Sequence, residues 1–324
     1  MKAFLRRWWQ EVTHKRALAK EERRLERLHN RLCNKSEGIL TWQDYKHPWA
    51  HVLYVAIIIF LTLVLFAAIV PAVWLFISSF KSTAELYQVP YVLWPSEFDL
   101  GKLVEVWKYL DFTKYFVNSL IVVVGAVVCS VVFNGILAYA ISILKPRGHK
   151  IVFAAVMLSY MIPAVTSIVP LFKNIAMLNL IDSYIPLWFI FGANAFYFMM
   201  FKTYFDSIPK ALLEAARLDG ASDLQIFFSI VAPLSKPIMG VVAIFTTTAA
   251  WSDFLLPYLV LQDEGMQTVM VKIFSIQSTI ATNPDFGPDK LLMLLSISII
   301  PQIILFIVFQ KQITGTSSTS GMKE

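Results

Sequence analysis

Six long apolar runs, each long enough to cross a lipid bilayer, most constrain what this chain can fold into. About 20 predominantly apolar residues cross the hydrocarbon core as a helix, which satisfies its backbone polar groups internally. Hydrophobic residues make up 57% of the 324 residues, whereas soluble domains contain about 45–50%. The sequence therefore predicts an all-α transmembrane protein with spans at residues 51–80, 117–144, 151–175, 184–204, 237–259 and 291–309.

The distribution of basic residues predicts the orientation of these spans. Residues 1–50 form a basic, amphipathic arm that is too polar and too long for a cleaved signal peptide. The turn at 145–150 carries basic residues and no acid, whereas the loops expected outside hold at least as many acids as bases. Because basic residues favour the cytoplasmic side, we expect both termini inside, with residues 51–310 as the permease domain and 311–324 as a cytoplasmic tail.

The polar stretch at residues 202–237, between the fourth and fifth runs, contains the start and stop signals of two short helices. Ser207 is expected to cap the first helix, with Pro209 in its first turn. Gly220 follows the last residue of that helix, where a left-handed conformation carries no Cβ penalty. We therefore expect a sharp bend at Gly220.

The second short helix has its own boundary signals. Ser222 and Gln225 have the spacing of a capping box, and Pro233 is expected to end the helix. Two interpretations of the whole stretch are open: a loop that merely connects two spans, or a knob that docks a cytosolic partner. The residues that favour docking are small or charged: Glu214, Ala215, Ala216, Arg217, Asp219 and Asp223.

The same stretch resembles the "EAA" signature of permeases from ABC importers. The matching residues are Glu214, Ala215, Ala216, Gly220, Ile230 and Pro233. The chain departs from the signature at Ala232, where the family usually has Leu. The flanking residues, Ala221 among them, resemble the carbohydrate-uptake branch. This resemblance implies a six-span type I ABC importer permease with a cytoplasmic coupling-helix elbow, in the bacterial cytoplasmic membrane.

The resemblance also implies partners and site residues. The expected partners are a second, homologous permease, two ABC ATPase subunits, a solute-binding protein, the carbohydrate and membrane lipid, with no nucleic acid. The loop at 262–288 is expected to reach into the solute-binding protein. The residues expected to dock the ATPase are Glu214, Ala215, Ala216, Arg217, Asp219, Gly220, Ala221, Ser222, Asp223 and Pro233.

The chain lacks the common signatures of catalysis. No GxxxxGK[S/T] phosphate loop occurs, and the histidines have no zinc spacing. Cys33 and Cys129 lie far apart and are poor candidates for a disulfide. We expect no catalytic residue, metal or cofactor in this chain, with ATP and Mg²⁺ in the ATPase subunits. A membrane-embedded hydrolase lacks a motif, and a secondary carrier or non-ABC channel lacks the intramembrane charge it usually shows.

The substrate path is expected beside the fifth span. Trp251 and Asp253 resemble the sugar-importer pattern Trp-x-Asp-Phe-x-x-Pro, and an interfacial position at a span end is the alternative. A further candidate is Thr247, for which a hydrogen bond to its own helix backbone is the alternative. Asn194 and Tyr197 are candidates too, with helix packing or interhelical hydrogen bonds as the alternative. An oligosaccharide is the expected substrate, and the net charge of +6 leaves an acidic one, such as an alginate oligosaccharide, open.

Overall fold

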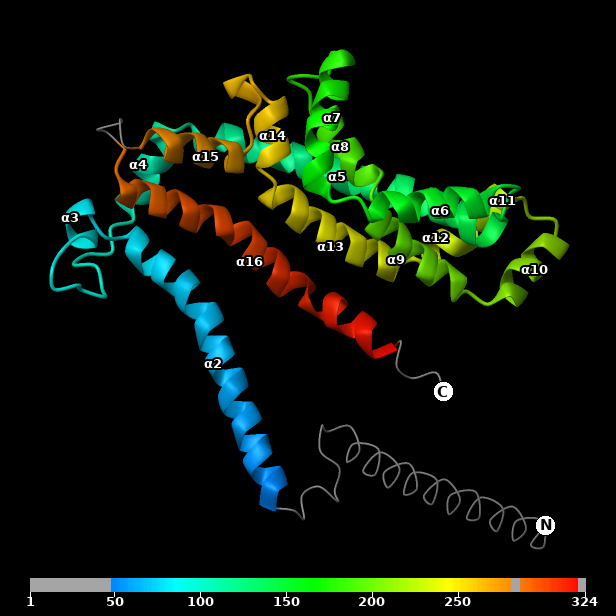
Figure 1. The fold of residues 1–324 in the computed structure, drawn as a ribbon, viewed down its shortest axis with the longest axis horizontal. Helices are drawn as coiled ribbons and strands as arrows, with labels where there is room; N and C mark the ends of the chain where they lie inside the picture. The colour runs from blue at the N-terminus through cyan, green and yellow to red at the C-terminus, as the bar shows by residue number, and fades with distance from the viewer. Residues whose placement is uncertain (1–47, 281–285, 320–324) are drawn as a thin grey trace, which may run out of the picture. The chain divides into compact units, whose positions relative to one another are not determined.

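A computed structural model describes residues 48–280 and 286–319 of the chain, and every regular element in these two ranges is a helix (Figure 1). Nearly all of the predicted basic arm, with Cys33, lies outside the described residues. The helices of the membrane domain are α2 (Pro48–Ser79), α5 (Phe112–Tyr139) with η2 (Ala140–Leu144), α6 (His149–Tyr160), α7 (Ala164–Met177), α8 (Ile185–Gly192), α9 (Ala195–Asp206), α13 (Lys236–Ser252), α14 (Leu255–Val260) and α16 (Pro288–Thr319).

The chain divides into two units, residues 1–73 and 74–324. The described part of the first unit belongs to α2, an apolar helix that continues without a break through Pro71. A proline inside a membrane helix is tolerated when neighbouring groups satisfy the freed carbonyl. The second unit holds the remaining helices and the packed core.

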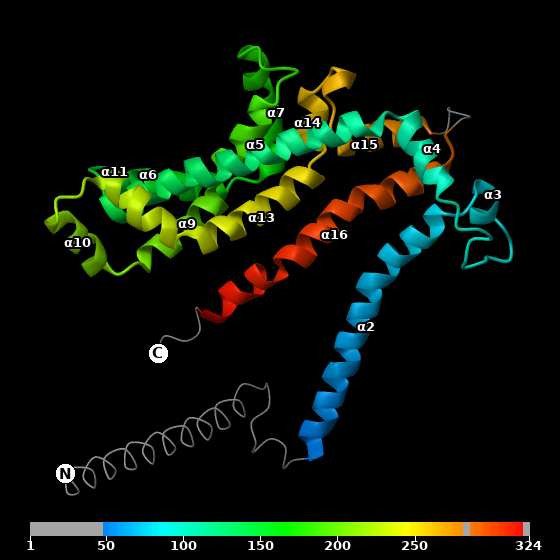
Figure 2. The same ribbon diagram turned by 180° about the vertical axis from the view of Figure 1, so that it is seen from behind.

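Helix α5 is the centre of the second unit, with α8, α9 and α13 packed along it (Figures 1 and 2). Small residues of α5 lie where the neighbouring helices pack closest. A Cβ on Gly125 would lie 2.2 Å from Trp188 Nε1, and Ser130 and Ala138 are fully buried. Small residues let membrane helices approach closely where no hydrophobic effect drives association.

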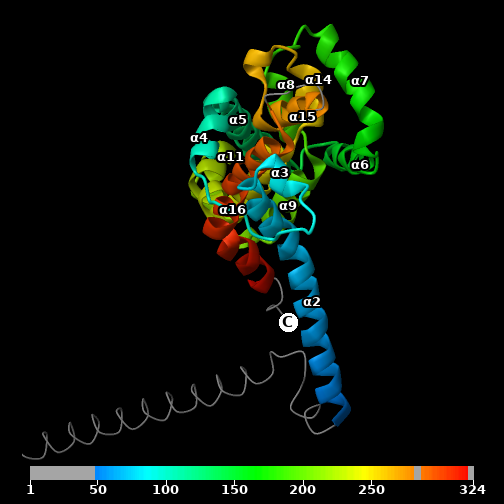
Figure 3. The ribbon, with the colours of Figure 1, turned by 90° about the vertical axis from the view of Figure 1, so that its left-hand side faces the viewer.

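The predicted third span, residues 151–175, is two helices in the structure. Helices α6 and α7 meet at 108° (Figure 3), and Pro163 stands immediately before α7 in an extended conformation. Proline has no N–H and restricts the residue before it, so the helix ends ahead of Pro163. Pro170 lies inside α7. The sequence predicts one span here, and the structure breaks it at Pro163.

Two further predicted spans are also broken. Helices α8 and α9 bend by 41° at a break occupied by Asn194, and α13 ends at Ser252 before α14 begins. Among the described residues, three helices are long and apolar enough to cross a bilayer. Up to six spans result when each bent pair is counted as one, the third such pair being Asp223–Leu234 with α13. The chain is therefore a multi-pass membrane protein with an interrupted helical core.

The loops expected outside are more structured than their sequence indicates. The first contains α3 (Thr83–Leu86) and α4 (Gly101–Tyr109). The second, the loop at 262–288, contains η4 (Glu264–Met266) and α15 (Val269–Thr279). In the last span, α16 continues to Thr319, although we expected the span to end at 309 and a cytoplasmic tail to begin at 311.

Candidate functional site

The elbow, which comprises the short helices at residues 210–234 between the fourth and fifth predicted spans, begins with α10 (Lys210–Leu218). The residue that we expected to cap α10 does not cap it. Ser207 closes α9, and its hydroxyl donates to the Tyr204 carbonyl over 2.6 Å. Pro209 is the residue before α10, and no side chain caps the helix. The prediction for Ser207 was wrong because a serine in the last turn of a helix can donate to the backbone carbonyl of the residue three positions earlier.

The bend after α10 has the geometry of a Schellman motif. Gly220 adopts φ +84°. The N–H of Ala221 donates to the carbonyl of Ala216 over 3.0 Å, and the N–H of Gly220 donates to that of Arg217 over 3.1 Å. These two bonds satisfy carbonyls that the end of a helix otherwise leaves unpaired. The predicted left-handed glycine at this position is confirmed.

The second helix begins as expected and ends differently. Ser222 and Gln225 form a complete capping box at the start of α11 (Asp223–Ile226). A π-turn, η3 (Phe227–Val231), then leads into α12 (Ala232–Leu234), which contains Pro233. Because Pro233 cannot donate, the helix widens ahead of it, and the N–H of Ala232 bonds to the carbonyl of Phe227. The break falls at Ser235, two residues after the proline, with a bend of 72° into α13.

Both short helices are anchored in the core of the membrane domain. Leu213 of α10 and Ile226 of α11 are buried in one cluster with Phe205. The hydroxyl of Tyr139, at the end of α5, donates to the Asp223 carbonyl over 2.8 Å. The two short helices are therefore in direct contact with α5 and α9.

The outer face of the elbow combines charge with exposed apolar side chains. Glu214, Ala215, Asp219 and Gly220 are exposed, and Arg217 pairs with Asp223 at 3.4 Å. Three apolar side chains are also exposed, namely Leu218 (89%), Leu224 (71%) and Phe228 (68%). Exposed apolar residues rimmed by polar ones are typical of protein–protein contacts.

Sequence reasoning missed these apolar residues. Leu218 follows the buried Leu213 by five positions, which places it about 140° round the helix by the 3.6-residue period. A helical projection of α10 would have shown a leucine on the polar face. For Leu224 and Phe228 the sequence offers no such signal, because the π-turn shifts the helical phase between them.

The residues predicted to line the substrate path lie at two places in the second unit. Trp251 is buried, donates from Nε1 to the Ser298 carbonyl over 3.0 Å, and packs edge-on against Phe116. Asp253 is partly buried at the break between α13 and α14, where it accepts from the backbone N–H groups of Leu255 and Leu256. The structure thus brings Asp253 to an interrupted helix, a common location for solute sites in transporters.

The other three path candidates make bonds within their own helices or to neighbouring ones. The Thr247 hydroxyl donates to the Ala243 carbonyl over 2.8 Å. Asn194 caps α9 by accepting from the N–H groups of Phe196 and Tyr197. Tyr197 itself is buried in the core cluster. Solute contact by these five residues stays a prediction.

The described residues contain no group of three or more His, Cys, Asp or Glu side chains placed to hold a metal ion. What they do contain is an interrupted helical bundle with a bent, capped, partly apolar elbow between two spans. These features define the class: a multi-pass membrane permease. The chain belongs to the family of binding-protein-dependent transport system inner membrane components, which matches residues 38–314.

Curated relatives extend over most of the chain. The chain is 31% identical to the diacetylchitobiose uptake system permease protein NgcG of Streptomyces coelicolor, over 77% of this chain and 82% of the relative. It is 34% identical to the arabinooligosaccharides transport system permease protein AraQ of Bacillus subtilis, over 65% of this chain and 74% of the relative.

A solved structure shares the fold. One chain of a bacterial ABC transporter involved in the import of the acidic polysaccharide alginate superimposes with a TM-score of 0.73 at 25% identity, covering 82% of this chain and 98% of that one. The expected type I ABC importer permease fold is confirmed. The family also identifies the chain as the membrane component of a system that works with a solute-binding protein, rather than a channel or secondary carrier.

Proposed function

We propose that this chain is the permease subunit through which an ABC importer passes an oligosaccharide. We also propose that an ATPase subunit docks on its elbow and that the elbow transmits the conformational change of that subunit to the spans. The geometry of the elbow carries the proposal: a left-handed glycine and a capping box fix the angle between α10 and α11. Exposed Leu218 and Leu224 offer the partner an apolar contact.

The partners follow from this role. Two ATPase subunits hold the ATP and Mg²⁺, one of them on this elbow, and a second, homologous permease completes the pathway. The chain itself carries no catalytic residue and no cofactor. The elbow and the amino-terminus face the cytoplasm, and the loop with α15 faces the solute-binding protein.

The elbow is tested by reversing one charge. We expect Glu214→Lys to insert into the membrane and pair with the second permease, yet to lose the ATPase subunits on purification. Truncating a buried charged contact costs about 2–5 kcal/mol. Glu97→Lys, an exposed carboxylate in the opposite loop, is the control and should keep the ATPases. Wild-type transport by Glu214→Lys with the ATPases bound would show that the elbow is not the docking site.

An oligosaccharide substrate is supported by the relatives named for diacetylchitobiose and arabinooligosaccharides. The structural neighbour named for alginate keeps an acidic oligosaccharide as the alternative. Uptake of a labelled neutral oligosaccharide, compared with uptake of a labelled oligouronide, decides between the two. Uptake of the oligouronide alone would identify the acidic class.

The path is tested at the break in the fifth span. Asp253→Ala should lower transport while assembly and basal ATP hydrolysis persist, because one lost hydrogen bond to a sugar costs about 0.5–1.5 kcal/mol. Thr248→Val in α13 is the control, since its hydroxyl bonds to the Ile244 carbonyl of its own helix. Equal loss of assembly by Asp253→Ala would instead mark this carboxylate as a structural cap of α14.

A further inference from the structure

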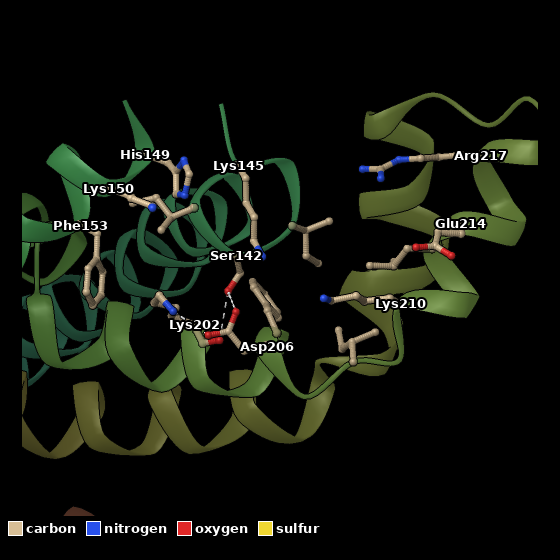
Figure 4. Close-up of a pocket in the computed structure, with 15 residues that line it drawn as sticks. Ser142, Lys145, His149, Lys150, Phe153, Lys202, Asp206, Lys210, Glu214 and Arg217 are labelled. Atoms are coloured by element: carbon tan, nitrogen blue, oxygen red, sulfur yellow. Dashed lines mark hydrogen bonds and ion pairs between the residues drawn. The ribbon is translucent and has the colours of Figure 1, made fainter. Parts of the chain in front are cut away.

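A cavity of about 600 Å³ separates α10 from the ends of η2, α6 and α9 (Figure 4). Its charge is strongly unbalanced, with five lysine or arginine side chains and two carboxylates. The cationic residues are Lys145, Lys150, Lys202, Lys210 and Arg217, and the carboxylates are Asp206 and Glu214.

Ion pairs with carboxylates within the described residues involve two of these five cations. Lys202 pairs with Asp206 at 2.6 Å, and Asp206 also accepts from Ser142. Arg217 pairs with Asp223. Within residues 48–280 and 286–319, Lys145, Lys150 and Lys210 take part in no ion pair. Lys145 and Lys210 point into the cavity from opposite sides (Figure 4). Like charges held together favour an anion between them.

The cavity also has apolar walls. Ile143, Phe153 and Leu213 line it beside the lysines, and the Lys202 ammonium lies 5.1 Å from the centre of the Phe153 ring. A ligand that fills it should therefore combine an anionic group with an apolar stem. A small hydrated anion would leave these walls without a partner.

The position of the cavity indicates where such a ligand comes from. It lies at the ends of the spans that contain η2, α6 and α9. The ends of transmembrane helices lie at the level of the lipid headgroups. Basic pockets between membrane helices on the cytoplasmic side are suited to anionic headgroups.

We propose that this cavity binds an anionic phospholipid of the cytoplasmic leaflet. The phosphate lies among Lys145, Lys150 and Lys210, and the start of the acyl chains follows Ile143 and Phe153. The proposal rests on the cytoplasmic orientation given under the proposed function. Because Lys210 belongs to α10, while Lys145 directly follows η2 and Lys150 lies in the first turn of α6, the headgroup bridges the coupling helix and the membrane domain.

Lipid binding is measured on the complete transporter by native mass spectrometry, with phosphatidylglycerol and phosphatidylcholine as probes. Each lysine near a membrane surface contributes about 1 kcal/mol to binding anionic lipid. The double variant K145Q/K150Q should therefore bind phosphatidylglycerol about 30-fold more weakly, equivalent to about 2 kcal/mol. Its weak binding of phosphatidylcholine should not change.

Two matched variants separate charge from damage to the fold. K145R/K150R keeps both charges and should bind phosphatidylglycerol as the wild type does. Lys236→Gln removes an exposed lysine at the start of α13, outside the cavity, and should have no effect. Equal loss in Lys236→Gln and K145Q/K150Q would indicate general surface attraction and would overturn the site.

Two further outcomes would overturn the lipid assignment. If K145Q/K150Q binds phosphatidylglycerol as the wild type does, these lysines hold no headgroup. If excess inorganic phosphate displaces the bound lipid, the cavity is a site for a free anion. Neither readout depends on transport or on ATPase retention, so failure here is distinct from failure of the proposed function.

Discussion

Gly220 shows what a single residue can decide in the elbow. Its φ of +84° costs an L-residue strain, although a Cβ there would meet nothing within 4 Å. We expect Gly220→Val to impose about 1–2 kcal/mol of strain and to misdirect α11. The predicted readout is loss of the ATPase subunits when the complex is purified.

A matched glycine isolates the conformational effect. Gly240 in α13 also has open space around it and no positive φ, so Gly240→Val adds the same side chain without that strain. It should retain the ATPases. If both variants retain them equally, the left-handed conformation at Gly220 does not matter for docking.

Glu85 gives a pH dependence at the scale of one side chain. Hydrogen bonds from Ser96 and Ser82 hold the pKa of its carboxyl at about 2, below the usual 4.5. The folded-state pKa is lower than the unfolded value, so this stabilisation is fully present above pH 4.5 and is lost as pH falls toward about 2. Pepsin cleavage of the loop at 81–98 should therefore increase over this window.

The amide variant Glu85→Gln provides the comparison, because it cannot ionise. Its loop should be cleaved readily throughout the same pH window, without the rise expected for the wild type. Identical cleavage profiles for the two proteins would show that the carboxylate does not hold this loop.

At the scale of elements, the contact between α5 and α8 depends on Gly125. A Cβ there would lie 2.2 Å from Trp188 Nε1, and overpacking of this kind costs about 1–3 kcal/mol. We expect Gly125→Ala to lower the Tm of the purified complex. Gly240→Ala, which meets nothing within 4 Å, should leave Tm nearly unchanged.

A second change tests whether Trp188 is the cause. Trp188 Nε1 is buried and has no hydrogen-bond partner among the described residues, so Trp188→Phe removes bulk without breaking a bond. Gly125→Ala combined with Trp188→Phe should regain part of the lost Tm. No recovery would mean that the clash is elsewhere.

At the scale of the whole molecule, the orientation of the spans can be checked by labelling. Single cysteines placed at Lys210 and Glu97, in a variant whose Cys33 and Cys129 are replaced, should react from opposite sides of the membrane. The basic turn at 145–150 predicts that position 210 reacts only from the cytoplasm. External labelling at position 210 would overturn the topology and the docking role with it.

The sequence alone determined the class of the fold, the bend at Gly220 and the start of the second short helix at Ser222. Apolar length predicts spans because a bilayer leaves few ways to satisfy the backbone. Gly220 and Ser222 predict the bend because their signals act over three or four residues. Local chemistry of this kind can be read without knowing what packs against it.

Only the tertiary structure decided which side chains are buried and where the helices break. Trp251 belongs to a buried contact with Ser298, 47 residues away, and Tyr197 to the core, neither of which a local pattern shows. The 108° turn between α6 and α7 and the π-turn before Pro233 depend on how neighbouring helices accommodate a proline. The basic cavity arises because a turn at Lys145 and a helix starting at Lys210 meet in space, and that meeting is a product of long-range packing.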